Sequence, residues 1–197
     1  MRVSISARRT ARDRMDFIQV NALRAVGVAY HNLKLEEDAL RRAEEAEQHR
    51  VTKRLPTFWL PHVYRNQLNA LAGTSRFSMR AAQKIANRAH DACNATSTGD
   101  GDLLHFLIAR SLANAFVAHD NIRESMPLFD RLAAQLDGVH RIGILHRVMF
   151  MRSAAMAHVK ANDTAGVEYW RVQGIALAKA AGLHNQLAQL RAMTPNH

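Results

Sequence analysis

Histidine, cysteine and acidic side chains could ligate a metal or carry out acid–base catalysis, but their spacing here favours neither. The chain has eleven histidines, and no two of them are three or four residues apart, so no helix face can present a histidine pair to a metal. His90–Asp91 and His119–Asp120 are adjacent pairs, and neighbours on a helix point in different directions, which favours surface histidines over an oriented base. HExxH, CxxC and glycine-rich phosphate-loop patterns do not occur. The sequence therefore predicts no catalytic residue, no metal and no cofactor.

Four basic residues spaced by four could instead contact phosphates: Arg76, Arg80, Lys84 and Arg88. On an expected helix over 75–94 they form a basic ridge on the side opposite the apolar residues, so the ridge is expected to face outward. Such a row can position a nucleic-acid backbone or an acidic protein surface. No aromatic residue interleaves for base stacking, and no nucleic-acid-binding motif accompanies the ridge, so a solvated helix face is the favoured interpretation.

The composition is typical of a packed helical protein with a strong positive charge. Apolar residues make up 48% of the 197 residues, against nine glycines and four prolines. The formal charge of +10 favours acidic partners. The lone Cys93 cannot form an internal disulfide, which predicts a buried thiol and a reducing, cytoplasmic location. The most apolar stretch, Leu103 to Ala118, is interrupted by polar residues, so no membrane association is expected.

Apolar residues recur at spacings of three and four through almost the whole chain, and no stretch alternates with a period of two. This pattern predicts an all-α fold without strands. The expected helices cover residues 9–33, 35–51, 57–72, 75–94, 102–118, 121–136, 140–161, 164–181 and 184–193.

Residues at the expected helix ends support these boundaries. Side chains that can cap a helix N-terminus are Thr57, Ser75, Asp102 and Asp163, and glycines suited to a left-handed stop are Gly73 and Gly182. Pro127 is expected to kink the first turns of its helix or to delay its start. The polar segment 96–102 divides the chain into two pairs of helical hairpins, although it is too short for a domain linker.

A ladder of small and bulky residues occurs twice at the same intervals. Its first copy is Leu23, Val26, Gly27, Tyr30, Ala39, Ala43 and Ala46, and a shift of 86 residues gives Ala109, Leu112, Ala113, Phe116, Ser125, Phe129 and Leu132. The ladder resembles the packing positions of tetratricopeptide repeats (TPR), where small residues let two helices touch and an aromatic ring fills the remaining gap. The unit here spans 42 to 43 residues, against about 34 in the standard repeat, and is similar to the sensing arms of bacterial regulators.

The resemblance implies one TPR-like domain over residues 1–197, a right-handed α-α superhelix. Its four hairpins would cover 9–51, 57–94, 102–136 and 140–181, followed by a capping helix over 184–193. In such a superhelix the first helix of each hairpin lines a concave groove. The residues expected in the groove are Asn21, Arg24, His31, Asn66, Arg110, Asn114, Arg152, Met156 and Lys160.

Three of these residues, Arg24, Arg110 and Arg152, recur at one structural offset. A line of guanidinium groups could grip an acidic peptide or a chain carboxylate through bidentate bonds. The alternative is that these arginines pair with acidic residues of neighbouring helices or simply solvate the groove.

The expected function is therefore a non-enzymatic protein- or peptide-binding scaffold with a basic concave groove, such as the sensing or docking part of a bacterial regulatory system. The expected partner is an acidic protein or peptide. The alternative is a nucleic-acid-associated regulator that binds phosphates through the basic ridge. The arginine-rich start of the chain is a candidate contact with a partner or a second copy, which leaves a homodimer open.

Overall fold

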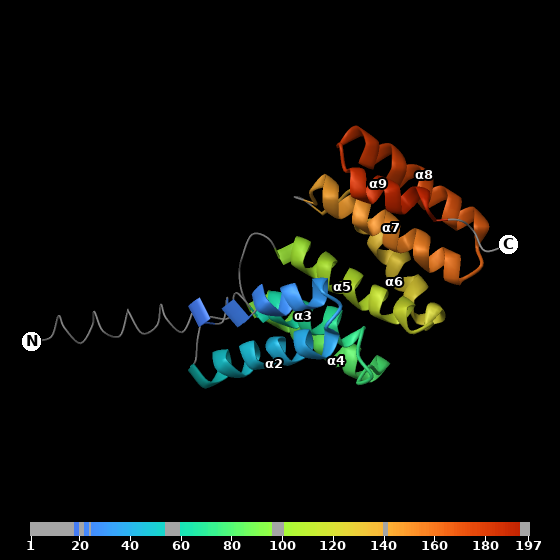
Figure 1. Ribbon diagram of the computed structural model, residues 1–197. Helices are drawn as coiled ribbons and strands as arrows, with labels where there is room; N and C mark the ends of the chain where they lie inside the picture. Colours follow the sequence, from blue (N-terminus) through green and yellow to red (C-terminus); the bar gives the residue numbers. More distant parts are fainter. Residues whose placement is uncertain are drawn as a thin grey trace, which may run out of the picture. The chain divides into compact units, whose positions relative to one another are not determined.

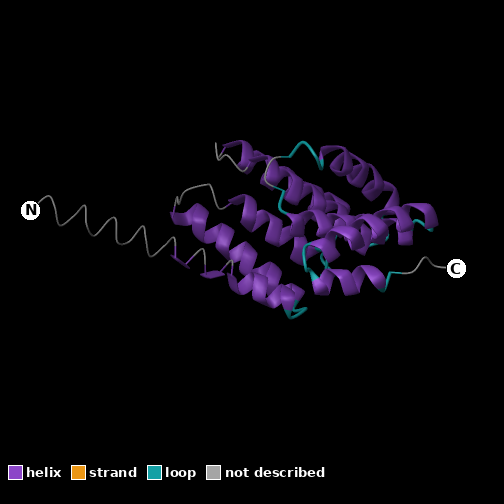
Figure 2. Cartoon of the chain, turned by 90° about the horizontal axis from the view of Figure 1, so that it is seen from above, coloured by secondary structure: helices purple, strands orange, loops and turns teal. Residues whose placement is uncertain are grey.

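The computed structural model describes residues 18–19, 22–23, 25–53, 60–95, 101–139 and 142–193, and every regular element in these ranges is a helix (Figures 1 and 2). Residues 25–32 are helical and precede the first labelled element. The labelled helices are α2 (Glu36–Lys53), α3 (Leu60–Leu71), α4 (Met79–Ala95), α5 (Gly101–Ala118), α6 (Ile122–Gln135), α7 (Ile144–Lys160), α8 (Thr164–Ala180) and α9 (His184–Arg191). The predicted all-α fold is confirmed. None of the described helices is long and apolar enough to cross a membrane.

The chain forms two compact units, Met1–Leu104 and His105–His197, and the boundary between them falls within α5. In the first unit, α3 packs against both α2 and α4. In the second unit, α7 packs mainly against α8 and also contacts α6 and α9. The single repeat domain and the superhelix expected over both units stay predictions.

The helix starts follow the expected capping chemistry in part. Asp163 caps α8, because its carboxylate accepts a hydrogen bond from the Gly166 N–H at 3.0 Å. At α4 the prediction was one turn too early, since the Ser78 hydroxyl, and not that of Ser75, accepts from the Ala81 N–H at 3.1 Å. Thr57 lies outside the described residues, and Asp102 lies inside the first turn of α5. α6 begins at Ile122 with the exposed Pro127 inside it, so this proline does not delay the helix start.

Four connections between consecutive helices share one backbone geometry. Each centres on a residue in the left-handed region: Lys34 (φ 62°), Asp120 (φ 57°), Asn162 (φ 56°) and Gly182 (φ 67°). At the first of them the Lys34 N–H donates to the His31 carbonyl at 3.0 Å, and the Leu35 N–H donates to the Tyr30 carbonyl at 2.9 Å. The same two bonds recur at the other three turns, and together they form the Schellman motif that satisfies the last carbonyls of a helix.

Of the two glycines expected at helix stops, only one is left-handed. The prediction at Gly182 is confirmed. At Gly73 it was wrong, because no positive φ occurs at this residue. Gly73 instead allows a close approach to α2, since a Cβ atom at this position would lie 2.2 Å from the Glu36 Cγ.

The ladder residues are more fully buried in the second unit than in the first. Six of the seven residues in the second copy are buried, and Ala109 is half-buried. In the first copy Gly27, Ala39, Ala43 and Ala46 are buried, Leu23 and Tyr30 are half-buried, and Val26 is exposed. A Cβ atom at Gly27 would lie 3.4 Å from the Ala39 carbonyl oxygen, which is an ordinary contact distance, so the position is close to α2 but does not exclude alanine.

An aromatic cluster forms the core of the second unit. The ring of Phe150 on α7 lies 5.7 Å from that of Phe106, 6.1 Å from that of Phe129 and 5.4 Å from that of Trp170, measured between ring centroids. These rings come from α5, α6 and α8, and tilted aromatic contacts of this kind add to the stabilisation from area burial. α7 is therefore the central helix of the unit.

In the first unit, Glu47 joins three helices through its carboxylate, which is 14% exposed. It accepts hydrogen bonds from the Tyr64 hydroxyl at 3.0 Å and from the Gln67 amide at 2.8 Å, both on α3. It also forms an ion pair with Arg88 on α4, whose guanidinium lies 4.6 Å from the centre of the Tyr64 ring.

Cys93, which is also on α4, is buried as predicted, and burial raises the pKa of its thiol to about 11.

Substitutions at two of the left-handed turn positions are expected to change the free energy of unfolding in opposite directions. Lys34→Gly should raise the free energy of unfolding by about 1 kcal/mol, because an L-residue in this conformation is strained and glycine is not. Gly182→Ala should lower it by a similar amount. Urea denaturation measures both changes, with Gly138→Ala as the control at a glycine without positive φ. An unchanged free energy of unfolding in Gly182→Ala would contradict this account.

Glu47→Ala is expected to lower the free energy of unfolding by about 2–3 kcal/mol, since it removes hydrogen bonds to a shielded carboxylate and leaves Arg88 without its partner. The matched control is Glu45→Ala on the same helix. Glu45 pairs with Arg42 within α2 and is 40% exposed, so its loss should cost less than about 1 kcal/mol. Equal losses from the two substitutions, measured by urea denaturation, would rule out a joining role for Glu47.

Candidate functional site

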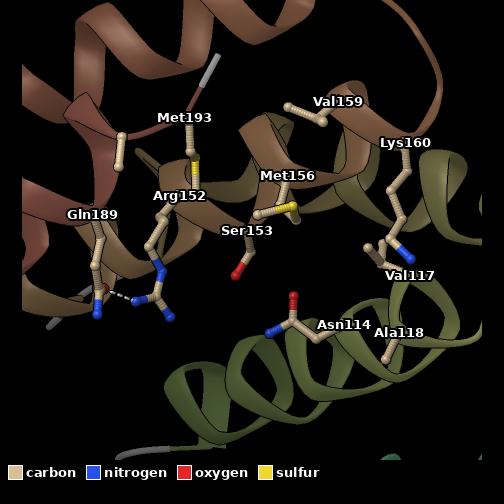
Figure 3. A pocket seen from close by; sticks show the side chains of 11 residues that line it. Asn114, Val117, Ala118, Arg152, Ser153, Met156, Val159, Lys160, Gln189 and Met193 are labelled. Carbon is tan, nitrogen blue, oxygen red and sulfur yellow. Dashed lines mark hydrogen bonds between the residues drawn. The ribbon is translucent and has the colours of Figure 1, made fainter. Parts of the chain in front are cut away.

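A pocket of about 650 Å³ lies in the second unit and is lined by side chains from α5 and α7 and from the end of the chain around α9 (Figure 3). The lining residues are Asn114, Val117 and Ala118 from α5, Arg152, Ser153, Met156, Val159 and Lys160 from α7, and Gln189, Ala192 and Met193 from the last helix and the residues after it. This volume is in the range of ligand-binding pockets.

The two faces of α7 explain why its side chains line the pocket. Arg152, Met156 and Val159 are spaced by four and three residues, so they lie along one side of the helix. The fully buried Phe150 and Ala154 belong to the other side and pack in the core. The aromatic cluster around Phe150 thus fixes the orientation of α7, and this orientation turns the polar and flexible side chains toward the pocket.

Leu190 anchors α9 against the rest of the unit. Its side chain is 0% exposed and packs with Val148 of α7 and Ala178 of α8. The approach is close at position 174 of α8, because a Cβ atom added at Gly174 would lie 2.9 Å from the Leu190 Cδ1 and the leucine would have to shift. The anchored helix carries Gln189, the preceding residue, to the edge of the pocket.

Arg152 is a cation with no acidic partner among the described residues. Its guanidinium donates a hydrogen bond to the side-chain oxygen of Gln189 (Figure 3). Burial lowers the pKa of Arg152, because partial desolvation disfavours the charged form. An arginine nevertheless stays protonated at neutral pH, so the pocket contains a positive charge held only by a neutral amide.

The remaining lining is mostly apolar, with a few polar groups. The Asn114 amide and the Ser153 hydroxyl lie opposite each other, and Met156 lies above them in the close view (Figure 3). The Ser153 hydroxyl donates to the Met149 carbonyl at 3.0 Å. Lys160, at the far end of the pocket from Gln189, forms an ion pair with Asp120. Arg152 is therefore the lining cation that a ligand anion could reach without breaking an existing ion pair.

The lining combines cationic, amide and apolar side chains. Histidine, cysteine and carboxylate side chains, which ligate metals and transfer protons, are not among the residues around this pocket. In the ranges that the structure describes, no group of three such residues could hold a metal ion. A guanidinium, two amides and an apolar wall can orient an anionic ligand that also has an apolar part.

Four of the nine residues expected in the groove meet in this pocket: Asn114, Arg152, Met156 and Lys160. Arg110 does not join them, because it is 7% exposed and does not line the pocket. It lies in the middle of α5, where Ile108 and Leu112 are also buried. The expected line of accessible guanidinium groups is therefore wrong at this position.

The other expected groove residues lie in the first part of the chain. Asn21 and Arg24 are outside the described residues. His31 lies 2.6 Å from the Glu36 carboxylate, measured between Nδ1 and Oε2, and this contact spans the first turn. Asn66 lies on α3 and is half-buried. His31 and Asn66 belong to the first unit and do not line the pocket described above.

All four residues of the basic ridge are exposed, as predicted, but they do not all lie on one helix. Arg76 lies before α4 and pairs with Glu44 at 2.7 Å, which raises the pKa of Arg76. Arg88 is held by its ion pair with Glu47. The other two ridge residues, Arg80 and Lys84, are exposed on α4. Two of the four charges are thus neutralised by glutamates of α2.

Gln189 and Met193 are site residues that the sequence did not predict. The last helix was expected to be a solvating cap, and their part in the pocket depends on how this helix folds back on α7. The apolar pair Leu187 and Leu190 was the available signal, since it shows that one side of the last helix must pack on the core.

Comparisons of the chain with protein-family models, with curated proteins and with solved structures find no match. The similarity to tetratricopeptide repeats therefore rests on the residue ladder, and membership of that family stays a prediction.

Proposed function

We propose that this protein is a non-enzymatic binding protein that holds an acidic peptide in the pocket lined by α5, α7 and α9. The observation that carries the proposal is Arg152, a partly buried guanidinium held by a neutral amide instead of a carboxylate. A carboxylate forms shorter and stronger hydrogen bonds with arginine than an amide does, and it can bind two N–H groups at once. An acidic side chain of a ligand would therefore gain a strong contact here.

The rest of the lining suits a peptide that has an apolar residue near its acidic one. Asn114 can donate to a peptide carbonyl and accept from a peptide N–H, because its amide has both kinds of group. Met156 and Met193 are unbranched and flexible, so they can adjust to apolar side chains of different shape. The net charge of +10 would also draw acidic partners to the protein.

The resemblance to sensing arms of bacterial regulators adds a context to this proposal. A regulator of that kind binds a signal or a partner and passes the change to another part of the system, so the chain would act as a docking or sensing part. The alternative, nucleic-acid binding through the basic ridge, has weaker support because Arg76 and Arg88 are held by glutamates.

An array of ten-residue peptides tests the proposal. Peptides in which a glutamate is flanked by apolar residues are expected to bind better than the same peptides with glutamine. In Arg152→Ala the affinity for the best peptide, measured by fluorescence anisotropy, should fall about tenfold or more, since a charge-assisted bond contributes about 1.5–3 kcal/mol. Arg152→Lys should restore the affinity only in part, because an ammonium lacks the planar fork.

The matched control is Arg131→Ala, which removes an equal charge from an exposed position on α6. It should change the affinity less than about twofold, as surface charges have small effects. Equal losses in the two variants, or no preference of the wild type for glutamate, would overturn the proposal. Salt-sensitive capture of DNA that is lost in an Arg80→Ala, Lys84→Ala double variant would support the alternative.

A further inference from the structure

Gln189 is hydrogen-bonded to the Arg152 guanidinium, the group on which the proposed function depends. Its side-chain oxygen accepts a hydrogen bond from Arg152, although Gln189 itself is exposed at the edge of the pocket. The interacting residues are 37 positions apart in the sequence, so the contact exists because of the way α9 returns to α7. The pocket therefore contains an internal ligand for its own cation.

We infer that Gln189 is a specificity-determining competitor: a ligand carboxylate binds by replacing the Gln189 amide oxygen on Arg152. This inference rests on the proposed function and adds the way the same site is regulated. The competitor is weaker than a carboxylate, because the amide has one oxygen without a formal charge, whereas a carboxylate is charged and can bind two N–H groups at once. A ligand without an anionic group would gain nothing by the exchange, so Gln189 excludes neutral ligands.

The backbone of α9 holds the competitor in place. Leu190 is fully buried against Val148 and Ala178, and its close contact at Gly174 leaves little room for the helix to shift. Only the Gln189 side chain needs to rotate when a carboxylate arrives. We therefore expect the side chain at position 189 to modulate the affinity of Arg152 for anions. Leu190 instead holds α9, and with it one wall of the pocket, in place.

The type of residue at position 189 should consequently change binding in either direction. In Gln189→Glu the new carboxylate would form an internal ion pair with Arg152, and a ligand anion would have to displace an equal group. In Gln189→Ala the internal acceptor is removed, and Arg152 is open to the ligand. A residue with a merely structural role would weaken binding in both variants.

Hexanoate is a suitable probe, since it joins one carboxylate to a short apolar chain, and hexanamide is its neutral counterpart. NMR spectra of the arginine Nε–Hε groups in the whole protein report on Arg152 directly. Hexanoate is expected to shift the Arg152 signal in a saturable manner, and hexanamide is not. In Gln189→Glu the hexanoate dissociation constant should rise about tenfold or more, whereas in Gln189→Ala it should fall about two- to threefold.

Gln186→Glu is the matched control, because it adds the same charge one turn earlier on α9 and does not line the pocket. Its hexanoate affinity should stay close to that of the wild type. Thermal unfolding verifies that each variant is folded, and the internal ion pair should leave Gln189→Glu at least as stable as the wild type.

Unchanged hexanoate binding in Gln189→Glu, or weaker binding in Gln189→Ala, would overturn the inference. The absence of any hexanoate-induced shift of Arg152 in the wild type would overturn it as well. Failure of the inference is distinguishable from failure of the proposed function, because the peptide array decides the latter with a different class of ligand.

Discussion

One wall of the pocket depends on the close packing of α9 against α8. Leu190 is buried against Ala178 of α8, and a Cβ atom added at Gly174 would lie 2.9 Å from the Leu190 Cδ1, so the glycine lets the two helices pack without a shift of the leucine. This contact fixes the last helix against α7, although α9 is only eight residues long and an isolated helix of that length would not be stable in water. The wall of the pocket and the partner of Arg152 both follow from it.

Partial burial without an acidic partner distinguishes Arg152 from the paired basic residues and from the exposed Arg80 and Lys84 in the described part of the chain. Arg76 and Arg88 are paired with glutamates, and Lys160 is paired with an aspartate, so much of the positive charge serves to connect helices. Partial burial of an arginine beside a neutral amide is less favourable than burial beside a carboxylate. A cation that is shielded but not neutralised supports the proposal of an anionic ligand.

Helix periodicity was sufficient to predict the fold class and most helix boundaries, because the spacing of apolar residues reports directly on which face is buried. Asp163 and Gly182 were predicted from local chemistry, since capping and left-handed turns depend on a few neighbouring residues. Four residues that the resemblance to tetratricopeptide repeats placed in a groove line the pocket from α5 and α7. Spacing could not reveal that Arg110 is buried or that Glu44 and Glu47 hold the ridge arginines, because these facts depend on contacts between separate helices. The same reason explains why Gln189 was missed.

The most direct measurement of the central claim is a crystal structure of the protein soaked with 6-bromohexanoate, in which anomalous scattering locates the bromine atom. The account predicts bromine among the apolar residues of the pocket, with the carboxylate on the Arg152 guanidinium and the Gln189 side chain turned away. Bromine outside the pocket would contradict the account. An occupied pocket in which Gln189 still accepts the hydrogen bond from Arg152 would contradict it equally.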